Sequence, residues 1–125
     1  MPFNPLDTLP ADIIQRAGRI RLACFDVDGT LTDGQLYYDH LGNESKAYFV
    51  QDGLGLKLIQ RHGIVPVIIT ARDSASAVRR GADLKIETHV GVRDKLALLN
   101  QLCEREGIAL DQVAFIGDDL PDITC

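Results

Sequence analysis

The sequence lacks the features that mark secreted and membrane-spanning proteins. It has only three cysteines and no pair at C-x-x-C spacing, so we expect no disulfide framework and a reducing, cytoplasmic location. The longest apolar stretch, residues 64–69, is far too short to cross a bilayer. Residues 1–17 contain acidic side chains and no apolar core, so we expect no signal peptide there.

An excess of positive charge is missing as well. The formal net charge is −5, which disfavours nucleic acid and anionic membranes as partners. A small anionic ligand remains compatible with this charge, because a bound metal ion or a lysine can reverse the local field. What is present is ordinary for a globular protein. A chain of 125 residues with 46% apolar side chains can bury one core, so we expect a single domain over residues 1–125.

Apolar segments with strand and helix patterns alternate along the chain. We expect strands at residues 20–25, 64–70 and 113–117, a short strand that begins with residues 84–86, and helices at residues 10–16, 54–61, 73–82 and 93–106. Residues 35–39 and 45–50 flank a turn-like segment and predict a β-hairpin that carries all three tyrosines. The alternation predicts an α/β fold, a Rossmann-like doubly wound parallel sheet with the hairpin inserted after the first strand.

Two carboxylates follow the first expected strand. Asp26 and Asp28 are two residues apart, so in extended backbone their side chains point the same way and repel each other unless a cation or a shared proton lies between them. This arrangement is typical of a metal site, a nucleophile or both. A solvated acidic turn is disfavoured because the preceding strand is so apolar. An EF-hand is excluded because its closing glutamate would fall on Tyr37.

Other polar residues are expected at the same edge of the sheet, where ligands bind in parallel α/β folds. Each is unremarkable alone: a threonine can satisfy a turn, lysine and arginine are usually solvated, and acids favour the start of a helix. Together with Asp26 and Asp28 they indicate a Mg²⁺ site that receives a phosphate group. These residues are Thr70, Arg72, Lys95, Asp118, Asp119 and Asp122.

The order of these motifs resembles the haloacid dehalogenase-like phosphatases. The family has DxDGT after its first strand, a threonine after the second, a lysine that opens a later helix, and GDDxxD after the last strand; all four are present here. Between about residues 20 and 122 the sequence is more similar to one branch, the 3-deoxy-D-manno-octulosonate 8-phosphate phosphatases. The shared segments include residues 32–34, 42–44, 46–48, 52–55, 70–72 and 91–95.

The resemblance implies a reaction and a role for each residue. Asp26 would attack phosphorus and form an aspartyl-phosphate, and Asp28 would act as acid and then as base. Mg²⁺ would be held by the Asp26 carboxylate, the Asp28 backbone carbonyl and Asp118. The remaining roles are phosphate binding by Thr70 and Lys95, orientation of the metal waters and of Lys95 by Asp119 and Asp122, and contact with the sugar acid by Arg72.

The branch also implies an architecture and a partner. Its members have no cap domain and form tetramers in which the hairpins assemble and a neighbouring subunit helps to close each site. The spacing agrees, because the hairpin and one helix fill the interval between Asp28 and Thr70. Two departures stand out: Ala71 replaces a glycine usual in the family, and the sequence ends at Cys125, before a strand and helix expected from the family, so we expect a missing C-terminal part.

The substrate expected from this branch is 3-deoxy-D-manno-octulosonate 8-phosphate, whose hydrolysis supplies lipopolysaccharide precursor synthesis. Two alternatives remain open. One is a phosphatase of a related nine-carbon sugar-acid 9-phosphate, because the branch uses one scaffold for both. The other is a non-catalytic module that oligomerises or binds Mg²⁺.

Overall fold

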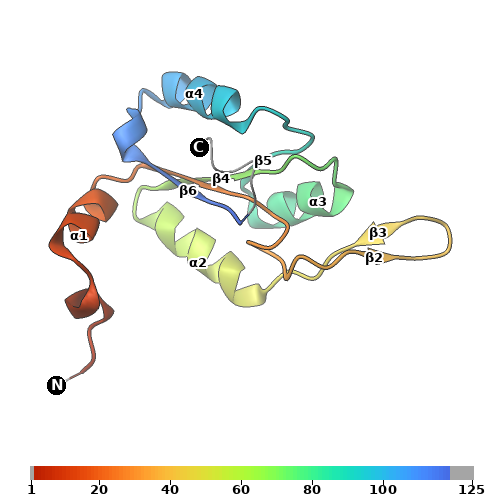
Figure 1. Ribbon diagram of the computed structural model, residues 1–125, viewed down its shortest axis with the longest axis horizontal. Helices are drawn as coiled ribbons and strands as arrows, with labels where there is room; N and C mark the ends of the chain where they lie inside the picture. Colours follow the sequence, from red (N-terminus) through yellow and green to blue (C-terminus); the bar gives the residue numbers. More distant parts are fainter. Residues whose placement is uncertain (1, 119–125) are drawn as a thin grey trace.

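The computed structural model describes residues 2–118, which form a parallel sheet with helices on both faces (Figure 1). The sheet has the order β5-β4-β1-β6. Its strands are β1 Leu22–Phe25, β4 Val65–Ile69, β5 Glu87–His89 and β6 Val113–Ile116. The helices are α1 Ala11–Gly18, α2 Val50–Arg61, α3 Ala75–Leu84 and α4 Lys95–Glu106, with short 3₁₀ helices at Pro5–Thr8 and Leu110–Gln112.

The strand order confirms the doubly wound fold. From β1 the chain builds outward to β4 and β5, and then returns to place β6 on the other side of β1. The order therefore reverses between β1 and β6, and the carboxyl ends of these two strands are where such folds bind ligands. Asp26 lies at this point, where its backbone N–H donates to the carbonyl of Ile116 at 2.9 Å.

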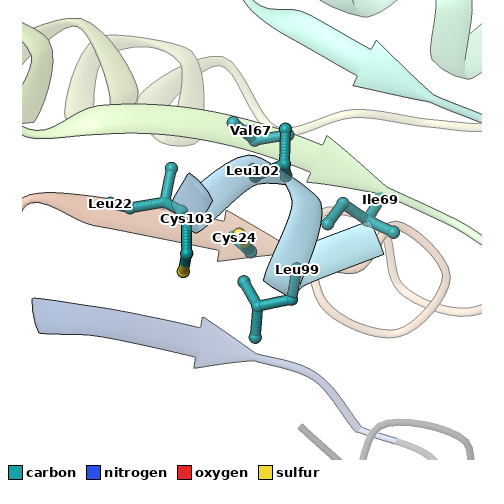
Figure 2. Packing of buried hydrophobic residues seen from close by; sticks show 7 residues of the cluster. All are labelled: Leu22, Cys24, Val67, Ile69, Leu99, Leu102 and Cys103. Atoms are coloured by element: carbon teal, nitrogen blue, oxygen red, sulfur yellow. The ribbon is translucent and has the colours of Figure 1, made fainter. Parts of the chain in front are cut away.

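Two hydrophobic clusters hold the helices against the sheet. On one face, alternate residues of β1 and β4 pack against Leu99, Leu102 and Cys103 of α4 (Figure 2). On the other face, α2 and α3 cover Ile68 and the loop after β1. Burial raises the pKa of the Cys103 thiol, which suits a packing role rather than a reactive one.

The hairpin is present, but it is shorter than the sequence predicts. Only β2 Tyr37–Tyr38 and β3 Glu44–Ser45 pair, and Figure 1 shows them extending away from the sheet. The prediction of a strand over residues 45–50 is wrong beyond Ser45, since Val50 already begins α2. The alternating apolar residues have another cause: Tyr48 turns inward and packs against the cluster under α2 and α3.

The start predicted for the strand after α3, at residues 84–86, is also too early. Leu84 ends α3, and Lys85 caps it in the left-handed conformation at φ 56° before β5 begins at Glu87. An apolar residue at the end of an amphipathic helix was therefore interpreted as the start of the strand. Across residues 2–118 no helix is both long and apolar enough to cross a membrane.

Candidate active site

The loop after β1 is held in a tight turn that fixes both aspartates. The carbonyl of Val27 accepts from the backbone N–H groups of residues 30, 31 and 32 at 2.9–3.1 Å. Thr32 Oγ1 accepts from the N–H groups of Gly29 at 3.3 Å and Gly34 at 3.1 Å. Both glycines have φ near +82°, a conformation that other residues adopt at a cost, so the DxDGT pattern is a backbone requirement as well as a chemical one.

Asp26 and Lys95 form a buried ion pair. Lys95 Nζ donates to Asp26 Oδ1 at 3.0 Å, and their side chains are only 3% and 9% exposed. Lys95 is the first residue of α4, whose start is fixed by Asp94: its side chain accepts from the N–H of Ala97. The sequence alone allowed a solvated lysine at this position. The structure instead places Lys95, the lysine of the third motif, in contact with Asp26, the expected nucleophile of the first motif.

Asp28 faces two cations that come from different parts of the chain. Lys46 Nζ lies 2.8 Å from Asp28 Oδ1, and Arg72 Nε lies 3.8 Å from Asp28 Oδ2. The Lys46 side chain is fully buried. Neither Lys46 Nζ nor Asp28 Oδ1 has an aligned hydrogen bond among the described residues, so the contact is an ion pair without hydrogen-bond geometry.

Lys46 is the residue of this site that the sequence interpretation missed. A usable signal was present: Glu44, Lys46 and Tyr48 are two residues apart, so in extended backbone they share one face. In the structure all three side chains point inward, away from solvent. Glu44 pairs with Arg72, Lys46 pairs with Asp28, and Tyr48 enters the core.

Arg72 is tied to the hairpin. Its guanidinium pairs with Glu44 of β3 and donates to the hydroxyl of Tyr38 on β2 at 3.3 Å. The hydrogen bond from Arg72 holds the pKa of Glu44 below its ordinary value. The same bond raises the pKa of Arg72, so both groups are charged at neutral pH. Arg72 is nevertheless 46% exposed and can reach a ligand.

Thr70 lies at the carboxyl end of β4 and is almost completely buried. Its backbone N–H donates to the carbonyl of His89 at 2.9 Å, and its carbonyl accepts from the N–H of Val92 at 3.0 Å. Thr70 Oγ1 accepts from the N–H of Arg72 at 3.4 Å. These bonds fix the hydroxyl at the ligand-binding edge of the strand next to β1.

Asp118 lies beside the loop that carries the two aspartates. A Cβ atom at position 29 would overlap the Asp118 carboxylate, so only glycine there lets this carboxylate approach the loop. No group of three or more His, Cys, Asp or Glu side chains suited to a metal ion occurs within residues 2–118. The expected ligand set needs only the carboxylates of Asp26 and Asp118 plus a backbone carbonyl, so the donors present fit Mg²⁺. Asp119 and Asp122 lie outside the described residues.

The missing side chain at Gly29 gives a direct test of the expected metal site. We expect Gly29→Ala to weaken Mg²⁺ binding by at least about tenfold, because the added methyl displaces the Asp118 carboxylate and strains the backbone at φ +82°. Isothermal titration with Mg²⁺ measures the effect. Gly42→Ala is the matched control, since Gly42 has a nearly equal φ of +84° and nothing within 4 Å of its Cβ position. Equal Mg²⁺ affinity in the two variants would contradict this placement of Asp118.

Comparison with known proteins gives a consistent family. No protein-family model matches the chain. A curated relative, 3-deoxy-D-manno-octulosonate 8-phosphate phosphatase of Haemophilus influenzae, is 39% identical over 110 residues, covering 87% of this chain and 61% of its own length. The chain thus spans about 60% of the length of the curated relatives it matches.

Solved structures agree on the fold. A hypothetical protein from Xanthomonas campestris is 59% identical with a TM-score of 0.96, covering 99% of this chain and 68% of that one. A 3-deoxy-D-manno-octulosonate 8-phosphate phosphatase from Moraxella catarrhalis, solved with magnesium, phosphate and the sugar acid, is 47% identical with a TM-score of 0.87, covering 90% and 66%. A putative hydrolase of haloacid dehalogenase subfamily III A from Legionella pneumophila is 40% identical with a TM-score of 0.87, covering 90% and 63%.

The solved structures carry the same fold over nearly all of this chain, and the names of the relatives from Haemophilus influenzae, Moraxella catarrhalis and Legionella pneumophila agree with the order of the motifs in its sequence. Only the short hairpin interrupts the described part of the domain, where a capped relative would have an inserted domain. The chain therefore belongs to the haloacid dehalogenase superfamily, and it is similar to the 3-deoxy-D-manno-octulosonate 8-phosphate phosphatases of that superfamily.

Proposed function

We propose that this protein is a Mg²⁺-dependent phosphatase that hydrolyses 3-deoxy-D-manno-octulosonate 8-phosphate to the sugar acid and inorganic phosphate. The observation that carries the proposal is the buried Asp26–Lys95 pair at the end of β1, where the strand order reverses. A nucleophilic carboxylate beside a fixed cation is what phosphoryl transfer requires. The names of the relatives supply the substrate class.

The chain's own residues can perform both half-reactions. An oxygen of Asp26 attacks phosphorus, the new O–P bond forms, and the bond from phosphorus to the sugar oxygen breaks. Asp28 gives its proton to the leaving oxygen, and then takes one from the water that hydrolyses the aspartyl-phosphate. Lys95 and Thr70 bind the phosphoryl oxygens. Mg²⁺, held by Asp26, the Asp28 carbonyl and Asp118, would offset the repulsion between two anions.

The surroundings of the loop suit a sugar acid. Arg72 reaches toward Asp28 from the neighbouring strand end and offers a guanidinium to a carboxylate or hydroxyl group of the substrate. A cavity of about 380 Å³ opens on residues 30–33 of the same loop, but Asp26, Asp28 and Arg72 do not line it, so it does not itself locate the substrate. It is lined by Thr30, Leu31, Thr32, Asp33, Ala47, Tyr48, Phe49 and Asp52.

Phosphate release from a panel of phosphate esters tests this function. We expect turnover of the eight-carbon sugar-acid 8-phosphate with Mg²⁺, its loss in EDTA, and recovery when Mg²⁺ is added back. The panel should include a nine-carbon sugar-acid 9-phosphate and an aryl phosphate. A higher kcat/KM for the nine-carbon ester would reassign the substrate. No phosphate release from any ester would favour a non-catalytic module.

We also propose self-association as a tetramer in the cytoplasm, and exposed apolar side chains on the hairpin and at the start of α2 support the self-association. Apolar side chains of the hairpin and of the start of α2 are 47–80% exposed, and a two-stranded hairpin that leaves the sheet cannot bury them alone. These residues are Tyr37, Tyr38, Leu41, Phe49 and Val50. Light scattering at micromolar concentration should give about four times the mass of one chain. A monomer mass would contradict the assignment.

A further inference from the structure

Lys46 is a buried charge for which the proposed reaction gives no role. Its side chain is fully buried although the hairpin around it is exposed. Removing an ammonium group from water is costly unless a partner compensates it. Among the described residues its ion-pair partner is Asp28, at 2.8 Å, and the Glu44 carboxylate also attracts it electrostatically. Lys46 is therefore held next to Asp28, which acts as acid and then as base in the proposed reaction. The desolvation free energy of its buried ammonium group calls for a functional explanation.

The two aspartates of the loop have the same kind of partner. Each pairs with its own buried lysine, Asp26 with Lys95 and Asp28 with Lys46. The lysines come from opposite parts of the fold: Lys95 from the start of α4, and Lys46 from the segment between β3 and α2. The first pair includes a hydrogen bond, whereas the second is an ion pair without one.

We propose that Lys46 is a positioning residue that fixes the carboxylate of Asp28 for proton transfer to the leaving oxygen. Lys46 attracts Oδ1, and this sets the rotation of the carboxylate, so Oδ2 is the oxygen on the side of the more exposed Arg72. Proton transfer depends steeply on such geometry. The hairpin would then contribute to catalysis through Lys46, besides any role in assembly. This inference rests on the proposed phosphatase function.

A series of aryl phosphates with increasingly basic leaving groups tests the proposal. 4-Nitrophenolate leaves without needing a proton, whereas unsubstituted phenolate and a sugar alkoxide need one. We expect Lys46→Met to lower kcat/KM less than about threefold for 4-nitrophenyl phosphate and at least about thirtyfold for phenyl phosphate, a substantial part of the roughly 10²–10⁴-fold that general acid–base catalysis contributes. A residue that only stabilises the fold would lower all members of the series equally.

Two comparisons make the test specific. Lys57→Met removes a partly buried lysine that donates to the backbone of Leu84 instead of to an aspartate, and it should leave the series unchanged. In an Asp28→Asn background, Lys46→Met should cause no further loss, because the two residues act as a unit. Thermal midpoints identify any variant that fails to fold.

Each outcome decides the question. An equal loss across the series, no loss at all, or full additivity with Asp28→Asn would each overturn the role of Lys46. A wild-type protein that hydrolyses none of these esters would instead overturn the proposed function, so the two failures are distinguishable. If Lys46→Met does not fold, the same series of esters is measured with Lys46→Gln, which keeps a polar side chain at this position.

Discussion

Replacing Asp26 by asparagine is expected to abolish phosphatase activity and to leave the fold intact. An amide cannot form the acyl-phosphate, so the covalent route is lost. The two side chains have nearly the same size, and the amide oxygen can still accept the bond from Lys95. We therefore expect at least about a thousandfold loss in kcat, or roughly 4 kcal/mol in barrier height, with little change in the thermal midpoint.

The matched control is Asp83→Asn, the same substitution on the exposed surface of α3. Asp83 pairs with Arg79 at 3.0 Å and its side chain is 52% exposed, so its loss should leave kcat unchanged. Activity of the Asp26 variant within about tenfold of wild type, a barrier change of only ~1.4 kcal/mol, would refute the nucleophile assignment. Mass spectrometry of the acid-quenched wild-type enzyme should also show one added phosphoryl group.

The fold and the end of β1 could be predicted from local signals. Apolar runs broken by polar residues mark buried parallel strands, and Gly29 marks a turn that needs positive φ. The family resemblance correctly grouped Asp26 with Lys95, which are far apart in the sequence. Their contact could not follow from spacing alone, because it depends on how α4 crosses the sheet.

The hairpin shows where the sequence pattern fails. A two-residue alternation is the same for a paired strand and for an extended segment that leads into a helix, so it could not separate Tyr48 in the core from a strand residue. The inward face of that segment carries Glu44 and Lys46, and their partners, Arg72 and Asp28, lie on other elements. The two-residue spacing indicates that these side chains share one face, but it does not indicate which residues they pair with. The roles of Asp119 and Asp122 stay predictions, since both lie outside the described residues.

Replacing Lys95 by alanine should cause the other large loss. Lys95 is 4% exposed, and its ammonium has three donors, so it can hold Asp26 and still reach a phosphoryl oxygen. Its Nζ also lies 5.6 Å from the ring centroid of Phe115, which adds a cation–π contact. The variant leaves the Asp26 carboxylate buried without this lysine, and it removes a charge that stabilises the transition state.

We expect kcat/KM to fall by about a hundredfold, roughly 3 kcal/mol, and inorganic phosphate to inhibit the Lys95→Ala variant much more weakly than wild type. Lys57→Ala serves as the control for the loss of a partly buried lysine outside the site. The two readouts separate two roles. A lysine that only holds the nucleophile would lower kcat while phosphate inhibition stays the same. A lysine that also binds the phosphoryl group must change both, so unchanged phosphate inhibition would remove Lys95 from the phosphate site.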